Sequence, residues 1–460
     1  MQVDLAIKSK NILTPSEIID GMVIISDGKI ADVIPAVSYG EQPESGLLDF
    51  QIEDVGDCVV MPGIIDPHVH INEPGRTDWE GFETATKAAA STGITMLVDM
   101  PLNSSPVTTT KNNFITKLEA AKNKLHVNCG FWGGVVPGNE NDLDDLLQAG
   151  ALGLKAFLTH SGIDDFPESH ESQLRNALHI LKKYDKPLLV HCELDGNSNL
   201  KKELEQNPRS YAAWMHSRPM SMEDAAIKMM IGLCRETGAR VHIVHLASEN
   251  SIEQIHKAKS DGLPLTVETA QHYLFFDAEN ISDGDTRFKC APPIRDKSNR
   301  ERLWDALGAG IIDFVATDHS PAPPELKEIN SGNFAQAWGG IAGLQFSLPS
   351  LWTGALERNY SVSDISKWLC EKPAKFLNLD NKKGKVSKGF DADLCVWMPA
   401  NNFIVREEDI LHRHKITPYT GQELYGIVRQ TYLAGSKIFD AGTFHHSNEG
   451  KIILNAWLKA

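Results

Sequence analysis

Short apolar runs recur along residues 62–383, and longer amphipathic segments separate them. This alternation is typical of repeated βα units, in which helices cover a sheet of parallel strands. Because a closed barrel of this type needs eight strands, the pattern predicts an α/β protein built on a (β/α)₈ TIM barrel. The runs that we expect to form its strands end near His70, Met100, Trp132, Lys155, His191, His245, Thr269 and Asp318.

The amphipathic segments between the runs predict helices, and three connections stand out because they are long or rich in Gly and Pro. Loops that follow the strands of a barrel commonly form the substrate pocket. We therefore expect such a pocket to be shaped by residues 72–81, 289–295 and 320–343. The expected helices are residues 84–92, 112–123, 174–184, 222–236 and 252–260.

The two ends of the chain differ from its centre. Residues 1–61 alternate short β-branched runs with turns, show no helix, and contain Asp27-Gly28, a strong hairpin signal. Similar runs return at residues 389–397 and 426–435. With 460 residues, the chain exceeds what one hydrophobic core usually holds. We therefore predict one small β-sandwich domain from residues 1–61 and 384–460, beside a barrel of residues 62–383.

Charge and composition exclude several classes of partner. The formal net charge of −16 at pH 7 argues against nucleic acid or an anionic membrane, because both would repel the chain. No apolar run approaches the roughly 18 residues of a membrane span, and the amino-terminal residues lack the pattern of a secretory signal. The seven cysteines form no C-x-x-C pair, so we expect a reducing, cytoplasmic setting without a disulfide framework.

Two histidines, His68 and His70, close an apolar run that begins at Val59. In an extended segment residues i and i+2 point to the same face, so both imidazoles can bind one cation together. An alternative interpretation is a strand end whose histidines are incidental, since a spacing of two is common by chance.

Four more ligand-type residues follow short apolar runs downstream: Lys155, His191, His245 and Asp318. In a TIM barrel the C-terminal ends of the strands meet at one face, so these side chains are expected to converge with the histidine pair. Together they suffice for two divalent cations that share a bridging ligand. Imidazole and carboxylate suit zinc, and also cobalt, manganese or iron.

Lys155 is the unusual member of this set. A protonated ammonium beside two dications would be strongly repelled, so the lysine must lie elsewhere, be neutral, or be chemically converted. Reaction with carbon dioxide would give a carbamate, whose carboxylate-like head can bridge two metals. The alternative interpretation is a surface or salt-bridging lysine.

The same residues indicate a class of reaction. Two metals lower the pKa of a bridging hydroxide toward neutrality, so that it can attack a carbonyl. Asp318 is the expected general base, which takes the proton and returns it to the leaving nitrogen. This apparatus fits an amide, a lactam or a phosphoester and leaves the substrate open.

Several motifs resemble those of the metal-dependent amidohydrolases and, within them, the cyclic amidohydrolases. The resemblance implies a (β/α)₈ barrel with a β-sandwich made from both chain ends. It also implies two metals held by His68, His70, carboxylated Lys155, His191, His245 and Asp318. His242 is a rival to His245, but only His245 is followed by Leu-Ala-Ser as in the family. The motifs are Pro62 to His70, Lys155, His191, His245, Thr317 to Pro321, and Gly389 to Asp393.

Within this group the chain is most similar to allantoinases, on residues 68–76, 99–103 and 318–327. Asn72 stands where similar dihydroorotases carry an arginine that binds the substrate carboxylate, and Ala322 replaces a usual cysteine. The resemblance implies hydrolysis of allantoin to allantoate in purine breakdown. We expect the small-molecule substrate to contact Asn72, Asn103 and Ala291, although Asn72 could instead be a turn former.

Other activities are alternatives to this one. Hydantoinases and dihydropyrimidinases carry a tyrosine shortly after the lysine, but residues 155–160 contain none. A dihydroorotase is a further alternative, and so is a non-catalytic scaffold, because some relatives have lost their metal ligands. The relatives also imply a homo-oligomer, either a dimer or a tetramer.

Overall fold

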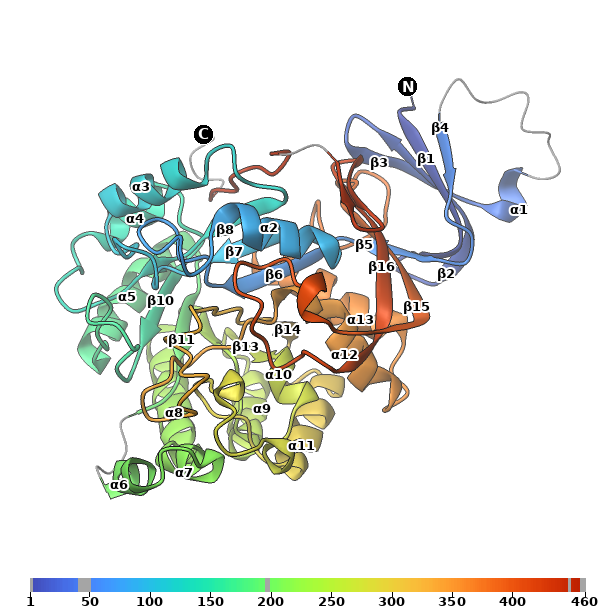
Figure 1. Ribbon diagram of the computed structural model, residues 1–460. Coiled ribbons are helices and arrows are strands. Elements are labelled where there is room, and N and C mark those ends of the chain that lie inside the picture. The colour runs from blue at the N-terminus through green and yellow to red at the C-terminus, as the bar shows by residue number, and fades with distance from the viewer. Residues whose placement is uncertain (1–2, 40–50, 195–198, 446–447, 456–460) are drawn as a thin grey trace.

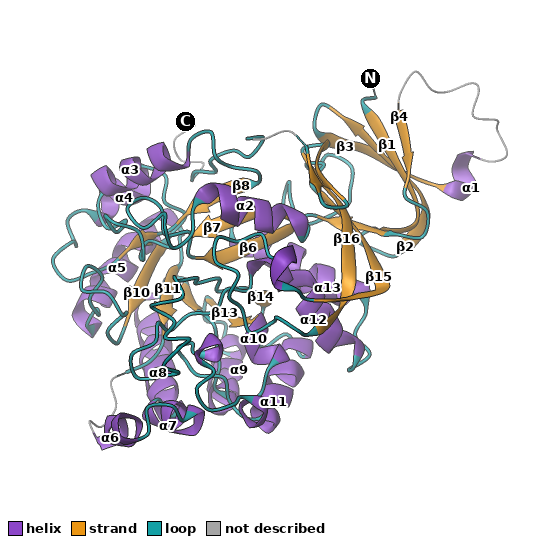
Figure 2. Ribbon diagram, viewed as in Figure 1, coloured by secondary structure: helices purple, strands orange, loops and turns teal. Residues whose placement is uncertain are grey.

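The computed structural model describes residues 3–39, 51–194, 199–445 and 448–455. Figure 1 shows a barrel surrounded by helices, with a sheet to one side of it at the upper right of the view. Figure 2 separates the same elements by type, with strands at the centre of the barrel and helices around them.

The barrel closes as predicted, with β8 and β9 acting as one bent strand. Trp132 lies at the bend: its N–H binds the Asp99 carbonyl at 3.0 Å, while Gly133 N–H binds the Gly153 carbonyl at 3.0 Å. A parallel bridge between Val69 and His319 joins the first strand to the segment after the last. The strands are β6 (Ile64–Val69), β7 (Ile94–Asp99), β8 (Asn128–Phe131), β9 (Gly133–Gly134), β10 (Leu154–Phe157), β11 (Leu188–His191), β12 (Val241–Ile243), β13 (Leu265–Ala270) and β14 (Phe314–Ala316).

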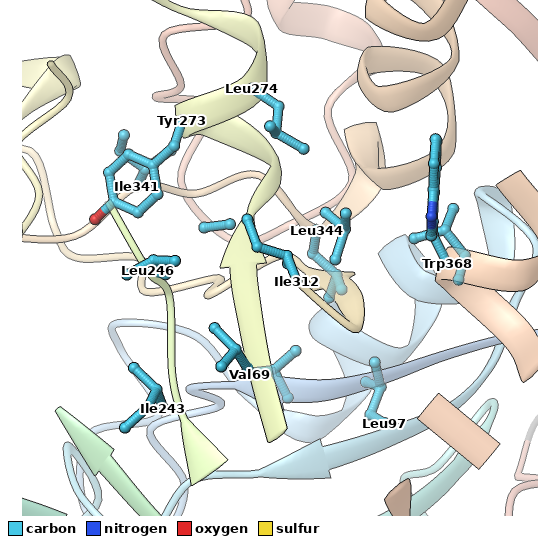
Figure 3. Close-up of a cluster of buried hydrophobic side chains, with 14 of the residues drawn as sticks. Val69, Leu97, Ile243, Leu246, Tyr273, Leu274, Ile312, Ile341, Leu344 and Trp368 are labelled. Carbon is cyan, nitrogen blue, oxygen red and sulfur yellow. The ribbon is translucent and has the colours of Figure 1, made fainter. Parts of the chain in front are cut away.

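Burial on both faces explains the continuous apolar runs of these strands, since helices cover the outside of a parallel barrel. Nearly every residue of β6 to β14 is buried. Figure 3 shows part of the resulting core, in which Val69 of β6 and Leu97 of β7 belong to the same apolar cluster as Trp368. Trp368 belongs to residues 367–371, which come after the last barrel strand and pack against β6 and β14.

The five predicted helices are confirmed as α2, α3, α5, α8 and α9, and their ends carry recognisable caps. Thr110 accepts a hydrogen bond from Asn113 N–H at the start of α3, and Gly238 ends α8 with a φ of 62°. None of the helices among the described residues is long and apolar enough to cross a bilayer. The helices of this region are α2 (Phe82–Ser91), α3 (Lys111–Ala121), α4 (Leu143–Gln148), α5 (Glu171–Tyr184), α6 (Asn199–Gln206), α7 (Tyr211–Ser217), α8 (Met220–Thr237), α9 (Ile252–Ser260), α10 (Gln271–Phe275), α11 (Lys297–Gly308), α12 (Ser347–Leu356), α13 (Val362–Ser366) and α14 (Lys372–Phe376).

Strands from both chain ends pair in one sheet, as the sequence predicted, and the described residues contribute nine strands to it. The seam is the antiparallel pairing of β5 with β15, in which Val60 faces Val396. The hairpin at Asp27-Gly28 is also confirmed, because both residues have positive φ (52° and 72°), as a tight primed turn requires. The strands are β1 (Leu5–Leu13), β2 (Ile18–Ser26), β3 (Lys29–Pro35), β4 (Gln51–Asp54), β5 (Val59–Pro62), β15 (Leu394–Ile404), β16 (Glu423–Leu433), β17 (Ser436–Asp440) and β18 (Thr443–Phe444).

One expectation for the amino-terminal segment is wrong. A single helical turn, α1 (Ala36–Tyr39), follows β3, whereas the sequence showed no helix there. Pro35 ends the strand, because it has no N–H to donate to a sheet partner. A turn this short leaves no amphipathic pattern that could have predicted it.

The carboxy-terminal segment returns to the barrel. Cys129 N–H binds the Lys451 carbonyl at 2.9 Å, and Ile453 N–H binds the Cys129 carbonyl at 2.9 Å. These bonds add residues 450–453 to the edge of β8 and so connect the end of the described chain to the barrel.

Candidate active site

The six residues predicted to bind metal line one cavity of about 300 Å³. They come from different strand ends, as a barrel active site requires. Lys155 lies within β10 and His191 ends β11. His68 lies in β6, with His70 just beyond it, while His245 and Asp318 each follow the last residue of β12 and β14 by two positions.

Within the cavity the donor atoms approach one another closely. His68 Nε2 lies 3.1 Å and His70 Nε2 lies 3.5 Å from Asp318 Oδ1, and the donor atoms of these three residues all lie within 4.8 Å of one another. On the other side, His191 Nδ1 lies 3.0 Å from His245 Nε2. The rings of His68 and His245 are 5.5 Å apart, so the two groups of donors are neighbours.

Backbone conformation aims two of these side chains. His245 and Asp318 have φ values of 39° and 46°, in the left-handed region that non-glycine residues seldom adopt. Such residues cost roughly 1–3 kcal/mol each and persist where the surrounding structure imposes them. The conformation turns the chain sharply after β12 and β14, which brings both side chains back over the barrel.

Lys155 is buried, and none of the described residues accepts a hydrogen bond from its Nζ. Burial lowers its pKa to about 8, so a substantial fraction of the amine is neutral near physiological pH. A neutral amine is the form that reacts with carbon dioxide. Burial and the missing acceptor argue against the surface or salt-bridging alternative for Lys155.

Glu268 of β13, a carboxylate that the sequence did not single out, contacts the ring nitrogen of His68 that does not face Asp318. One oxygen of Glu268 contacts His68 Nδ1, and the other lies 3.1 Å from His242 Nε2. Burial raises the pKa of Glu268, but the two imidazoles outweigh this effect and lower it to about 2. His242 thus contacts Glu268 and does not line the cavity, whereas His245 does line it.

Glu193 binds His191 as Glu268 binds His68, with one carboxylate oxygen against a ring nitrogen. Its Oε2 accepts a hydrogen bond from His191 Nε2 at 2.7 Å, and both of its oxygens bind the Arg218 guanidinium, at 3.0 and 2.6 Å. This contact fixes the tautomer of His191 so that its Nδ1 faces His245 with a free lone pair. The sequence signal that could have identified Glu193 and Glu268 is a charged residue within or just after an apolar strand.

Two of the three predicted substrate contacts line the cavity, namely Asn103 and Ala291. The Asn103 side-chain amide lies 3.2 Å from His70 Nδ1. In the structure the amide nitrogen, Asn103 Nδ2, faces the ring and donates to Nδ1. Turning the amide over would let its oxygen accept a proton from Nδ1 and leave the His70 Nε2 lone pair toward Asp318. Asn72 is buried with a φ of 67° and donates to the Pro321 carbonyl at 3.3 Å, and it does not line the cavity.

Comparisons with known proteins agree with this geometry. A family model described as "Amidohydrolase family" matches residues 59–438. The allantoinase of Arabidopsis thaliana is 44% identical over 449 residues, which cover 95% of this chain and 88% of the relative. The allantoinase of Streptomyces avermitilis is 43% identical, with coverage of 96% and 97%. The solved L-hydantoinase (dihydropyrimidinase) from Arthrobacter aurescens superposes with a TM-score of 0.91 at 28% identity, covering 99% of this chain and all of the other.

Proposed function

The chain belongs to the amidohydrolase family, and we propose from this premise that it is an allantoinase, which opens the hydantoin ring of allantoin to give allantoate. The observation that carries the proposal is the convergence of four histidines, an aspartate and a buried lysine on one cavity. Identity of 44% to a curated allantoinase along 95% of the chain supports this substrate over other cyclic amides.

The donor set fits two divalent cations held by His68, His70, His191, His245, Asp318 and Lys155 as a carbamate. The unpartnered, buried Nζ of Lys155 supports this fit, because a carbamate would supply the negative charge that two dications need. When bound, the cations polarise a carbonyl and lower the pKa of a water molecule. We propose zinc as the metal, with cobalt, manganese or iron accepted by the same donors.

Asp318 is the proposed proton carrier. Burial raises its pKa, but the imidazoles of His68 and His70 outweigh this effect and hold the pKa well below its ordinary value. The carboxylate is therefore ionised at neutral pH and can accept the proton of the attacking water. It then returns that proton to the ring nitrogen that leaves.

Substrate orientation is assigned to the loops after β7 and β13. Ala291 lines the cavity and can offer only its backbone groups and a methyl, which suits a neutral ring whose carbonyls and N–H groups alternate. Asn103 lies beside His70 and lines the cavity, so it can contact the substrate and also orient His70, a proposed metal ligand. Asn72 is proposed to act through the loop that contains Pro321.

The test is an assay of purified protein, loaded with metal in bicarbonate, against allantoin, dihydroorotate, hydantoin and dihydrouracil. We expect kcat/KM to be highest for allantoin. A higher value for hydantoin or dihydrouracil would instead make the chain a hydantoinase or dihydropyrimidinase, and activity only on dihydroorotate would make it a dihydroorotase. No turnover of any of them by fully metallated protein would favour a scaffold role.

Three further proposals rest on the sequence and the resemblance. We propose domain boundaries at residues 61–62 and 383–384, which place β5 across the first boundary as the strand that joins barrel and sheet. We propose a cytoplasmic homo-oligomer, a dimer or tetramer, that acts in allantoin degradation. Equilibrium sedimentation tests the oligomer, and limited proteolysis tests the boundaries.

A further inference from the structure

Lys289 is a buried lysine in the active-site cavity that the proposed chemistry does not use. The residue is 6% exposed and lines the cavity together with the metal-binding side chains. Its Nζ donates to the Ala337 carbonyl and lies 4.5 Å from the centre of the Trp214 ring. The Lys289 side chain therefore links its own loop, which follows β13, to the loop that carries Ala337.

A second basic side chain in the cavity, Arg218, differs from Lys289 in having an acid partner. The Arg218 guanidinium binds both oxygens of Glu193, which neutralise it. Across the described ranges of the chain, no carboxylate lies within ion-pair distance of Lys289 Nζ, and the charged group that shifts its pKa is Arg218. Burial, and to a lesser extent Arg218, lower the Lys289 pKa to about 7.

A lysine buried in this way lowers stability unless something else uses it. The Lys289 side chain carries three N–H donors as an ammonium and two as a neutral amine, and the Ala337 carbonyl accepts one of them. The remaining donors, on a side chain that lines the cavity, are available to a ligand inside it. The face of the Trp214 indole beside them offers a flat, apolar surface.

The position of Lys289 is fixed by a second buried lysine. Lys327 Nζ donates to the carbonyls of Lys289 at 3.1 Å, Trp338 at 3.1 Å and Gly340 at 2.8 Å. In addition, Gly340 N–H binds the Lys289 carbonyl at 2.9 Å. The backbone that carries Lys289 is thus tied to the loop opposite it, and a site held in this way is preorganised for a ligand.

We propose that Lys289 and Trp214 form a subsite for the ureido arm of the substrate, with Lys289 Nζ donating to the ureido carbonyl oxygen. The inference rests on the proposed function. Allantoin is a hydantoin ring that carries one ureido group on the carbon next to the carbonyl under attack. When the metal-binding residues hold that carbonyl, the arm extends into the remainder of the cavity. Its planar amide then fits against the indole face, and its oxygen is the strongest acceptor that it offers.

This assignment also explains how a ring with a ureido group is distinguished from a bare hydantoin ring. A ring without the arm leaves the Lys289 donors unpaired in a buried site, which disfavours its binding. Arg218 differs from Lys289 here, because its Nε and Nη2 already donate to Glu193.

The test is Lys289→Met, which keeps the apolar stem beside Trp214 and removes the donor. We expect kcat/KM for allantoin to fall about tenfold to a hundredfold, the usual effect of losing a charged donor to a buried acceptor. For hydantoin, followed as a substrate or as an inhibitor of allantoin turnover, the change should stay within about threefold. Lys289→Arg should recover part of the allantoin activity, because it restores a cationic donor.

The matched control is Lys186→Met, because Lys186 is also buried but lies outside the cavity. It should leave the ratio of allantoin to hydantoin activity unchanged. Equal losses for both compounds in Lys289→Met, with normal metal content and Tm, would overturn the subsite and assign Lys289 to loop packing, as would unchanged allantoin kinetics. If the unmodified enzyme does not hydrolyse allantoin, the proposed function fails, and the subsite fails with it.

Discussion

Thr317 Oγ1 donates a 2.5 Å hydrogen bond to Asp66 Oδ2, across the line where the first and last strands of the barrel meet. The other oxygen of Asp66 accepts from the backbone N–H of His68 and of Thr317. Because His68 and Asp318 follow these two residues closely, one carboxyl group sets both the closure of the barrel and the spacing of two proposed metal ligands.

The first prediction concerns this contact. Thr317→Val keeps the β-branched shape but removes the hydroxyl, so Asp66 loses a donor in a buried site. We expect the free energy of unfolding to fall by about 1–3 kcal/mol, and metal affinity to fall with it because His68 and Asp318 are less firmly held. Urea unfolding of metal-free and metal-loaded protein measures both effects. Unchanged stability in both states would show that the hydroxyl is not needed for closure.

The second prediction concerns the proposed ligands. His68→Ala or His191→Ala should reduce metal content and lower kcat/KM by on the order of 10³-fold, while the barrel still folds. The reason is that each imidazole faces the cavity and contributes little to the apolar core. Elemental analysis and far-UV circular dichroism give the two readouts. Two full metals per chain in either variant would contradict the ligand assignment.

Lys155 gives the third prediction. Lys155→Ala should be nearly inactive and should regain some activity when short carboxylic acids are added, because they can occupy the place of a carbamate head. The control is the same addition to unmodified enzyme, where no gain is expected. An active Lys155→Ala with normal metal content would make the lysine structural.

The convergence of the six proposed metal ligands on one cavity could be predicted from sequence for a simple physical reason. The C-terminal ends of barrel strands converge on one face. A polar residue directly after an apolar run, such as His191 or Asp318, is therefore expected at that face. The strands and five of the helices were predictable in the same way, because burial on a face or a stripe leaves a period in the sequence.

The residues that sequence missed depend on contacts between distant segments. Glu268 reaches His68 across 200 positions, and Lys289 owes its burial to the loop that carries Ala337. The charge of Glu268 within an apolar strand, and the place of Lys289 in an expected pocket loop, were visible in the sequence, but neither pattern identifies the partner that the side chain contacts. The left-handed backbone at Asn72 is similar, since asparagine favours such turns without requiring them.

A pH prediction follows from Glu223, which is buried in α8. Burial raises its pKa to about 8, so the folded protein keeps it protonated at pH values where the unfolded chain, with a pKa near 4.5, has lost the proton. The unfolded state therefore binds fewer protons between about pH 4.5 and 8, and the stability contributed by Glu223 falls as pH rises through this window. Glu223→Gln should flatten the decline, as chemical unfolding at pH 5 and pH 8 would measure. Parallel pH profiles for the two proteins would count against this account.

The last prediction concerns Asn72, whose amide binds the Pro321 carbonyl from a backbone with φ of 67°. Asn72→Gly keeps that conformation and removes only the amide, whereas Asn72→Ala also strains the turn by about 1 kcal/mol. If the amide orders the loop around the substrate, both variants should raise KM for allantoin, and Asn72→Arg should do so most, because a buried, unpaired cation would disturb the Pro321 loop that Asn72 holds. If Asn72 is only a turn former, Asn72→Gly should retain normal kinetics while Asn72→Ala loses stability. Steady-state kinetics and Tm for the three variants decide between these roles. Normal kinetics in Asn72→Gly and Asn72→Arg together would end the argument that this position selects the substrate.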